Sequence, residues 1–457
     1  MPAVDFLGCI GVRCRQHGYQ HHEQNRPGDR LDSNESMKIS VSRRNKCRLC
    51  GGGKLELVVP LAPTPVAEKY VTREELDQET PVYPLDLYLC LDCGHVQLLD
   101  VVDPEFLFDN YTYESGSTRQ IVQHFEKTVE AACARYHLPP NSLVVDVGSN
   151  DGSLLRCFQK RGLRVLGIDP ARDIAKKATQ SGIPTIAEFL NLELARKIKK
   201  EHGPAAVVCA FNVFAHADNL AGMADAIHEM LAPDGLFIFE VSYLLDILDH
   251  MLLGTIFHEH VSYHSVKPMA SFLRRHGMEL IDVQRVGIQG GSIIGTAQPV
   301  GGGHPATPMV DELLELERTR GLDRTGTLKE FATQLRKVKE ELGGLMADLK
   351  KQGKSIWGYG AARSGTTLIS QMNLGKVISY IVDDSPAKQN KFSPGDHIPI
   401  LPSKALAEQK PDYAFILAWV HARQIIENNR GYLAQGGRFI VCFPKIQVVT
   451  AEKPNLA

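Results

Sequence analysis

The fold is decided by the stretch Val144-Val145-Asp146-Val147-Gly148-Ser149-Asn150-Asp151-Gly152-Ser153, which is followed by the apolar run Val165-Leu166-Gly167-Ile168-Asp169. A β-branched run that breaks into a glycine-bearing turn and then a helix is typical of an α/β sheet with a nucleotide cradle. Glycines let the backbone approach the ligand, and an acid at the end of the second strand can accept both ribose hydroxyls. We therefore predict an α/β fold that binds an adenosine-type ligand at this turn.

The glycine pattern distinguishes between the ligands that such a turn can hold. A dinucleotide fingerprint G-x-G-x-x-G counted from Gly148 fails, because Asn150 and Ser153 stand at its other two glycine positions. The form Asp146-x-Gly148-x-Asn150-x-Gly152 instead resembles the first motif of class I S-adenosylmethionine (SAM) methyltransferases. A nicotinamide enzyme and a turn without a ligand are the alternatives. The residues that we expect to bind SAM are Asp146, Gly148, Asn150, Gly152, Asp169 and Asn212, the last of which follows the third predicted strand.

Composition limits the partners of the chain. Its 457 residues are 43% hydrophobic and 23% charged, with a net charge of −2, and this balance argues against a nucleic-acid partner, which would require a basic face. No apolar run approaches the roughly 20 residues of a membrane helix, and the first residues lack the basic start of a signal peptide. We expect a soluble, cytoplasmic protein without a membrane partner; composition does not predict its oligomeric state.

The pattern along the chain predicts several units. Apolar residues from Leu328 to Leu349 recur at helical spacing, and we expect them to pack between domains and not to form a coiled coil. Met37 is a candidate for the true start, because the preceding residues are polar and aperiodic. The expected segments are a disordered extension (1–37), a zinc-binding module (38–110), a methyltransferase core (111–300), a linker helix (301–352) and a C-terminal Rossmann-like domain (353–457).

Two C-x-x-C pairs predict a structural zinc site. They are Cys47-Arg48-Leu49-Cys50 and Cys90-Leu91-Asp92-Cys93, separated by short apolar runs and turns. Two such knuckles in a small β-rich module can close a tetrahedral thiolate site around Zn²⁺. Four thiolates leave no open coordination position, so the predicted role of the metal is structural. Four buried free thiols are the alternative.

A second glycine turn, Gly358-Tyr359-Gly360-Ala361-Ala362-Arg363, begins the C-terminal unit. Arg363 stands where a dinucleotide fingerprint needs its third glycine, so a purely structural turn is an equal alternative to a cofactor site. Arg363 and Lys388 could bind a diphosphate, since these side chains are the usual partners of phosphate oxygens. A solvated lysine on a turn is the alternative for Lys388.

Polar residues follow the third and fourth predicted strands, which we expect near Ala206–Ala210 and Leu236–Glu240. His216 follows the third strand, and Phe257-His258-Glu259-His260 comes shortly after the fourth. The His-Glu-His cluster is not a zinc-protease signature, because H-E-x-x-H needs the second histidine one turn further on. Two alternatives remain for His258 and His260: a metal site, or ordinary buried histidines with a structural role.

The order of these motifs resembles the nucleotide-sugar C-methyltransferases. The motifs are the four cysteines, Asp146 to Gly152, Asn212 to His216, Phe257 to His260, Gln289-Gly290-Gly291-Ser292, and Gly358 to Ala361. The resemblance implies a zinc module, a SAM-binding core and a C-terminal Rossmann-like domain. It also implies methyl transfer to a carbon of a deoxysugar on a nucleoside diphosphate, beside a 4-keto group, through an enolate.

The resemblance implies a role for particular residues. His260 would be the base that removes the carbon-bound proton, and Glu259 would orient His260 or contact the sugar. His216 and one tyrosine of the pair Tyr111 and Tyr113 would be polar partners of the enolate. Gly291 and Ser292 would contact the substrate. The chain departs from the family at Phe257, where a tyrosine is common, and at Ile293, where an arginine often follows the glycines.

Two other functions remain open at this point. The chain could be a zinc-bearing methyltransferase of another small molecule or of RNA. It could also be a binding protein whose methyltransferase fold has lost activity. The near-neutral charge counts against RNA, and the retained Asp146, Gly148, Asp169 and His260 count against a loss of activity.

Overall fold

The computed structural model describes residues 40–108 and 114–456. The expected extension of residues 1–37 and the candidates Tyr111 and Tyr113 lie outside the described residues. The described residues all belong to one compact unit. No helix in the described ranges is long and apolar enough to cross a membrane.

The centre of the molecule is a seven-stranded sheet in the order β10-β9-β8-β11-β12-β15-β14. Its strands are β8 (Leu143–Val147), β9 (Arg164–Ile168), β10 (Thr185–Ile186), β11 (Ala205–Phe211), β12 (Leu231–Ser242), β14 (Met278–Val286) and β15 (Ser292–Pro299). Only β15 runs antiparallel to its neighbours. The strand order reverses between β8 and β11, and the crevice at such a switch point is where open α/β sheets bind ligands.

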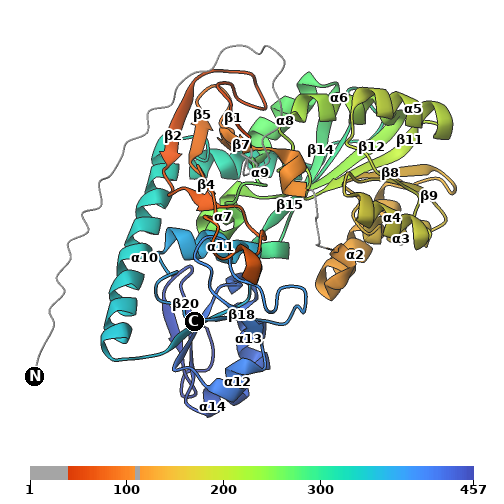
Figure 1. Cartoon of the computed structure of the whole chain (residues 1–457). Helices are drawn as coiled ribbons and strands as arrows, with labels where there is room; N and C mark the ends of the chain where they lie inside the picture. The colour runs from red at the N-terminus through yellow and green to blue at the C-terminus, as the bar shows by residue number, and fades with distance from the viewer. Residues whose placement is uncertain (1–39, 109–113, 457) are drawn as a thin grey trace, which may run out of the picture. The chain divides into compact units, whose positions relative to one another are not determined.

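Helices cover both faces of this sheet (Figure 1). One face packs against α5 (Leu192–His202), α6 (Leu220–Met230) and α8 (Val266–Arg275). The other face packs against α2 (Arg119–Tyr136) and α3 (Ser153–Gln159), and α4 (Arg172–Gln180) follows β9. Because both faces are buried, β8 is apolar throughout except for Asp146. The four predicted strands of the core are confirmed, whereas the antiparallel pair of β14 and β15 was not predicted.

The cysteine-bearing module contains three small antiparallel sheets. Its largest sheet has the order β13-β6-β5-β2, from β2 (Leu55–Val59), β5 (Leu87–Cys90), β6 (Val96–Leu98) and β13 (Ser262–Tyr263). The two smaller sheets pair β1 (Val41–Arg43) with β7 (Asp100–Val102), and β3 (Thr64–Pro65) with β4 (Val82–Tyr83); α1 spans Pro104–Phe108. Strand β13 comes from the chain after β12, so the module does not complete its sheet from its own residues.

Two helices, not one, span residues 301–352. They are α9 (Pro308–Arg320) and α10 (Thr325–Lys351). Gly321 ends α9 in the left-handed conformation, with φ of +63°, which glycine adopts at little cost. The predicted stripe on α10 is confirmed as a packing face, since Leu328, Leu335 and Leu342 are buried in a core shared with the zinc module and the C-terminal domain.

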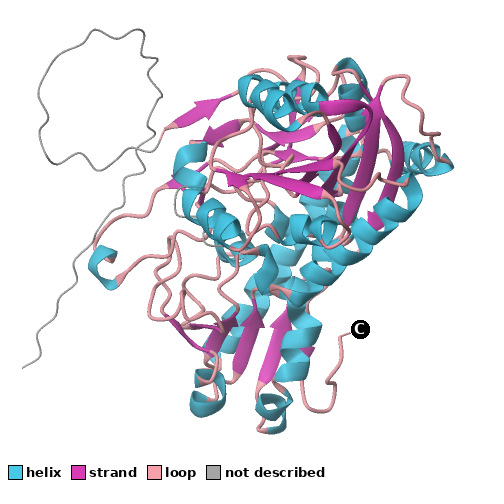
Figure 2. Cartoon of the chain, turned by 90° about the vertical axis from the view of Figure 1, so that its right-hand side faces the viewer, coloured by secondary structure: helices cyan, strands magenta, loops and turns pink. Residues whose placement is uncertain are grey.

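The C-terminal domain repeats the α/β design. Its sheet has the order β18-β17-β16-β19-β20-β21, and only β21 is antiparallel. The strands are β16 (Ile356–Tyr359), β17 (Ile381–Asp383), β18 (Ile400–Pro402), β19 (Tyr413–Ile416), β20 (Arg438–Val441) and β21 (Gln447–Val449). The helices are α11 (Arg363–Gln371), α12 (Ala405–Gln409), α13 (Ala422–Asn428) and α14 (Arg430–Ala434). Figure 2 shows the strands of this sheet as a group separate from those of the seven-stranded sheet.

Candidate active site

A carboxylate fixes the turn after β8. Asp169, at the end of β9, accepts hydrogen bonds from the backbone N–H of Asn150 (2.8 Å) and of Ala171 (2.9 Å). The turn itself is tight, because Gly148 and Asn150 both have positive φ, of 69° and 51°. Burial raises the pKa of Asp169, although the two N–H donors lower it in part. Each oxygen keeps a lone pair with which it can accept a ribose hydroxyl.

Asp146 and Gly152 lie next to the turn in tightly packed surroundings. Asp146 is buried next to this turn, and burial, with Asp169 as the second cause, raises its pKa to about 8. Gly152 has a φ of +77°, and a Cβ there would lie 2.8 Å from the Ile183 side chain. Neither residue lines the cavity described next, whereas the other four candidates for SAM binding do.

One large cavity of about 1300 Å³ lies at the carboxyl edges of both parallel sheets. The seven-stranded sheet contributes Gly148, Asp169 and Asn212 to its wall. The C-terminal domain contributes a second group of lining residues: Ala362, Arg363, Ser364, Lys388, Ala418, Val420 and His421. Sites for a single small ligand usually have about 300–1,000 Å³, so this cavity has room for two ligands.

His260 and His216 line the cavity side by side. Their rings lie 4.9 Å apart between centroids. Nδ1 of His260 lies 2.8 Å from the carbonyl oxygen of Thr255, the last residue of the turn η3 (Leu253–Thr255). A carbonyl can only accept, so Nδ1 carries the proton and the lone pair is on Nε2. Burial lowers the pKa of His260 to about 4 and lowers that of His216 well below its usual value, so both rings are neutral near pH 7.

Glu259 contacts the C-terminal domain. Its carboxylate lies 3.0 Å from Nη1 of Arg363. The Glu259 side chain is only 5% exposed, and this burial raises its pKa to about 7, although the Arg363 guanidinium lowers it in part. The group that orients the His260 ring is therefore the carbonyl of Thr255, a contact that no side-chain motif in the sequence could reveal.

The predicted diphosphate ligands Arg363 and Lys388 lie together and share an acidic partner. Glu68, from the zinc module, lies 3.1 Å from Nε of Arg363 and 3.2 Å from Nζ of Lys388. With Glu259, two carboxylates face two cations. Both cations thus have a carboxylate partner within the protein. Glu68 was not among the predicted site residues, because no motif surrounds it in the sequence.

The remaining substrate candidates lie in different surroundings. Gly291 packs closely on Asp246, since a Cβ at this glycine would lie 2.3 Å from the Asp246 side chain, and Ser292 is fully buried. Neither lines the cavity, although the preceding Ile288 and Gln289 do. Phe257 lines the cavity, and its ring centroid is 4.0 Å from that of His260.

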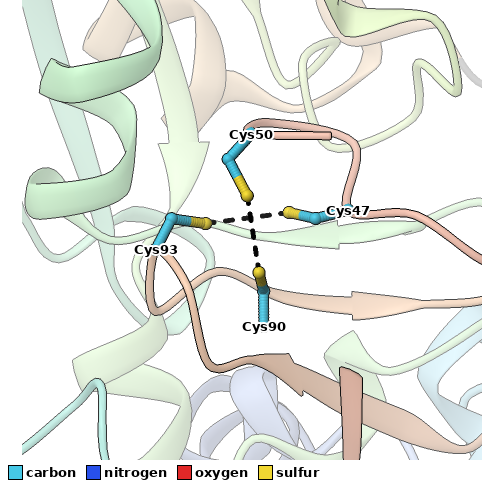
Figure 3. Close-up of side chains that lie close together, drawn as sticks. All are labelled: Cys47, Cys50, Cys90 and Cys93. Carbon is cyan, nitrogen blue, oxygen red and sulfur yellow. Dashed lines mark hydrogen bonds between the residues drawn. The ribbon is translucent and has the colours of Figure 1, made fainter. Parts of the chain in front are cut away.

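The four predicted zinc ligands come together in one cluster (Figure 3). Their sulfur atoms all lie within 4.8 Å of one another, with Cys47 and Cys93 at 3.7 Å and Cys50 and Cys90 at 3.5 Å. Zn–S bonds of about 2.3 Å in a tetrahedron require S–S separations of about 3.8 Å, so the cluster fits zinc.

The histidine alternative does not form a metal cluster. His258 Nε2 lies 3.2 Å from the carbonyl oxygen of Tyr83, and His260 is directed to Thr255. Within residues 40–108 and 114–456, the cysteines are the only group of three or more side chains with the spacing for a metal ion.

Comparisons with known proteins agree with this arrangement. Three family models match successive parts of the chain: "Putative zinc binding domain" over residues 47–108, "Methyltransferase domain" over 119–283, and "C-methyltransferase C-terminal domain" over 287–444. C-methyltransferase NovU of Streptomyces niveus is 36% identical over 417 residues, which are 91% of this chain and 99% of that protein.

Solved structures resemble parts of the chain. Magnesium protoporphyrin IX methyltransferase from Synechocystis PCC 6803 with bound SAH has 20% identity and a TM-score of 0.31, over 38% of this chain and 82% of that one. An S-adenosylmethionine-dependent methyltransferase from Clostridium acetobutylicum has 12% identity and a TM-score of 0.33, over 40% of this chain and 92% of that one.

The fold and the site define the chain as a SAM-dependent methyltransferase with a zinc-binding module. The seven-stranded sheet with its antiparallel β15, the turn held by Asp169 and the matched methyltransferase domain agree on this class. The similarity over nearly the whole chain then identifies it as a member of the C-methyltransferase family. Its cofactor is SAM, and its structural metal is zinc.

We predict that Asp169→Ala weakens SAM binding at least tenfold. A charge-assisted contact to the ribose contributes about 1.5–3 kcal/mol, and about 1.4 kcal/mol corresponds to a tenfold change in affinity. Asp383→Ala is a matched control, because Asp383 makes the same two backbone contacts in the C-terminal sheet. Calorimetry should show unchanged SAM affinity for this control. Equal losses in both variants would contradict a specific contact between Asp169 and the ribose.

We predict that Cys90→Ser lowers the zinc content of the purified protein from one ion per chain. Loss of the metal should loosen β5 and, through β6, the paired strand β13, so amide hydrogen exchange should rise at Ser262 and Tyr263. Cys133→Ser changes a cysteine outside the cluster and should retain the metal. A full zinc content in Cys90→Ser after chelation would contradict the assignment.

Proposed function

We propose that the protein methylates a carbon of a deoxysugar carried on a nucleoside diphosphate, beside a 4-keto group, through an enolate. The observation that carries this proposal is the cavity lined by both sheet edges. Asp169 and the Gly148 turn line one side, and the residues of the C-terminal domain line the other. A bound SAM and a substrate as long as a nucleotide sugar could then meet beside His260. We also propose that this reaction takes place in the cytoplasm.

The chemistry requires a neutral base and a donor to the developing oxyanion. A carbon becomes nucleophilic only when a proton next to a carbonyl is removed. Nε2 of His260 has a lone pair and can take that proton, while the bond of Nδ1 to Thr255 holds the ring in place. The electron pair of the C–H bond moves into the enolate, and its oxygen needs a hydrogen-bond donor.

We assign the donor role to His216, with one tyrosine of the pair Tyr111 and Tyr113. His216 is neutral, so one ring nitrogen carries a proton, and it lies beside His260 on the cavity wall. SAM, when bound, supplies the electrophilic methyl group. Phe257 has no hydroxyl to offer the sugar, so this side of the substrate contacts an apolar ring.

The direct test is to incubate the protein with SAM and a panel of nucleotide-linked 4-keto sugars. Mass spectrometry should show a gain of one methyl group in at least one sugar, and NMR should place the methyl on carbon. Sugars without the keto group should stay unchanged, because their C–H bonds are not acidic. Methylation of oxygen would contradict the enolate route.

We predict that His260→Asn lowers the methylation rate by about 100-fold to 10,000-fold, the usual effect of removing a positioned base. The same variant should stop the exchange of the carbon-bound proton with heavy water in the presence of S-adenosylhomocysteine, which cannot donate a methyl group. SAM affinity and melting temperature should change little.

His258→Asn is the control for this prediction. His258 is buried two residues away, its Nε2 faces the Tyr83 carbonyl, and it does not line the cavity. This variant can lose stability, but its folded fraction should exchange the proton at the normal rate. Normal exchange in His260→Asn would make His216 the better candidate for the base.

A further inference from the structure

The C-terminal sheet repeats the carboxylate device of the SAM turn. Asp383, at the end of β17, accepts hydrogen bonds from the backbone N–H of Ala361 (2.7 Å) and of Ser385 (2.8 Å), as Asp169 does from its own turn. The N–H of Gly360 donates to the carbonyl of Val382, as that of Gly148 does to Ile168. Unlike Asp169, however, Asp383 does not line the cavity.

A segment of the zinc module covers this second turn. The Tyr70 hydroxyl donates to the carbonyl of Ala361, and Lys388 Nζ donates to the same oxygen at 2.8 Å. The Glu68 carboxylate lies against Arg363, the first residue of α11, and against Lys388. A carboxylate of the chain itself thus stands near the start of the helix that follows the turn.

The conformation of Glu68 shows how firmly it is held. Its φ is +60°, in the left-handed region that residues other than Gly, Asn and Asp seldom adopt. Such a conformation persists only where the surrounding contacts determine it. The ion pairs with Arg363 and Lys388 are contacts of this kind. They also outweigh burial, which alone would raise the pKa of Glu68, and hold it below its ordinary value.

Arg363 joins Glu68 to the active-site loop. Its Nε faces Glu68 at 3.1 Å, and its Nη1 faces Glu259 at 3.0 Å. A guanidinium is planar and its donors are fixed relative to one another, so a displacement of Nε also displaces Nη1. Helix α11 also holds this loop through Thr367, whose hydroxyl donates to the carbonyl of Ile256 at 2.8 Å.

We propose that Glu68 is a positioning residue for the active site, which acts through Arg363 to hold Glu259 and, with it, the loop that carries His260. This role rests on the proposed function, because it assigns His260 to catalysis. It makes the zinc module part of the catalytic apparatus, although the cysteine cluster and the cavity are formed by different residues.

The proposal predicts a particular pH dependence. The charged groups that act on Glu259 are Arg363 from α11 and Glu68 and Lys69 from the segment between β3 and the turn η1 (Arg73–Glu75). The ion pair with Arg363 needs an ionised Glu259, whose pKa burial raises to about 7. Activity should therefore be full above this pH and should fall as the pH drops through it.

Glu68→Gln should lower the plateau rate by about 10-fold to 100-fold, the effect expected when reacting groups are slightly displaced. It should also move the acid limb of the rate profile to lower pH. In this variant the negative charge of Glu68 no longer raises the pKa of Glu259. Arg363 then has Glu259 as its remaining carboxylate partner of the two, which also lowers this pKa. Arg363→Gln removes the cation of the ion pair, so the acid limb should disappear and the rate should stay low at every pH.

Glu56→Gln is the matched control. Glu56 lies in the same module on β2 and pairs with Lys329 Nζ at 2.5 Å, and it does not line the cavity. This variant should change stability at most and leave the limb in place. If Glu68→Gln alters only the melting temperature, with the plateau rate of the folded enzyme and the limb unchanged, Glu68 is structural and the proposal fails.

A second measurement does not need the sugar substrate. The protonation of Glu259 can be followed by its infrared carboxyl band, identified by difference from Glu259→Gln. The midpoint should fall in Glu68→Gln and rise in Arg363→Gln. Shifted midpoints without methylation of any sugar would sink the proposed function and leave the coupling intact. If a sugar is methylated but Glu68→Gln changes neither the midpoint of Glu259 protonation nor the acid limb of the rate profile, only the coupling between Glu68 and Glu259 is overturned.

Discussion

A buried carboxylate at the end of the second parallel strand is the constraint on which both α/β domains depend. Such a carboxylate is costly to bury unless donors surround it, and Asp169 obtains two from the backbone of Asn150 and Ala171. These bonds fix the path of the glycine turn. In the first sheet Asp169 also lines the cavity, so the residue that shapes the turn is the one that we expect to contact the ribose of SAM.

In the second sheet, Asp383 also accepts hydrogen bonds from the backbone of its turn, but it does not line the cavity. Tyr70, Lys388 and Glu68 lie over this turn. The turn thus lines the cavity in one domain and contacts the zinc module in the other. At this junction Glu68 forms ion pairs with Arg363 and Lys388, and Arg363 also pairs with Glu259.

The sequence predicted the parts of the fold that local patterns encode. The apolar run before Gly148, the helical spacing on α10 and the doubled C-x-x-C pairs each rest on residues close together in the chain. The sequence did not predict the antiparallel strands β14 and β15, nor β13 in the sheet of the zinc module. These pairings join distant segments, and β13 has only two residues.

The site residues divide in the same way, into those that local motifs reveal and those that only the fold brings together. Four of the six residues proposed for SAM and both histidines line the cavity, since strand ends bring them together. The partner of His260 is a backbone carbonyl, and Glu68 lies far away in the sequence, so no motif could show either contact. Lys388 and Arg363 were expected to bind phosphate because their charge is visible in the sequence, and this stays a prediction. Their ion pairs with Glu68 are visible only in three dimensions.

The pairing of β13 with β6 also sets an order in which the chain can mature during synthesis. Ser262 lies opposite Gln97, so the edge of the N-terminal sheet stays unpaired until the ribosome has delivered the segment after β12. Contacts between such distant segments form late, because closing a long loop costs entropy. The cysteine knuckles, in contrast, are complete at Cys93. Zinc can therefore hold an unfinished N-terminal module together while the rest of the polypeptide is still being made.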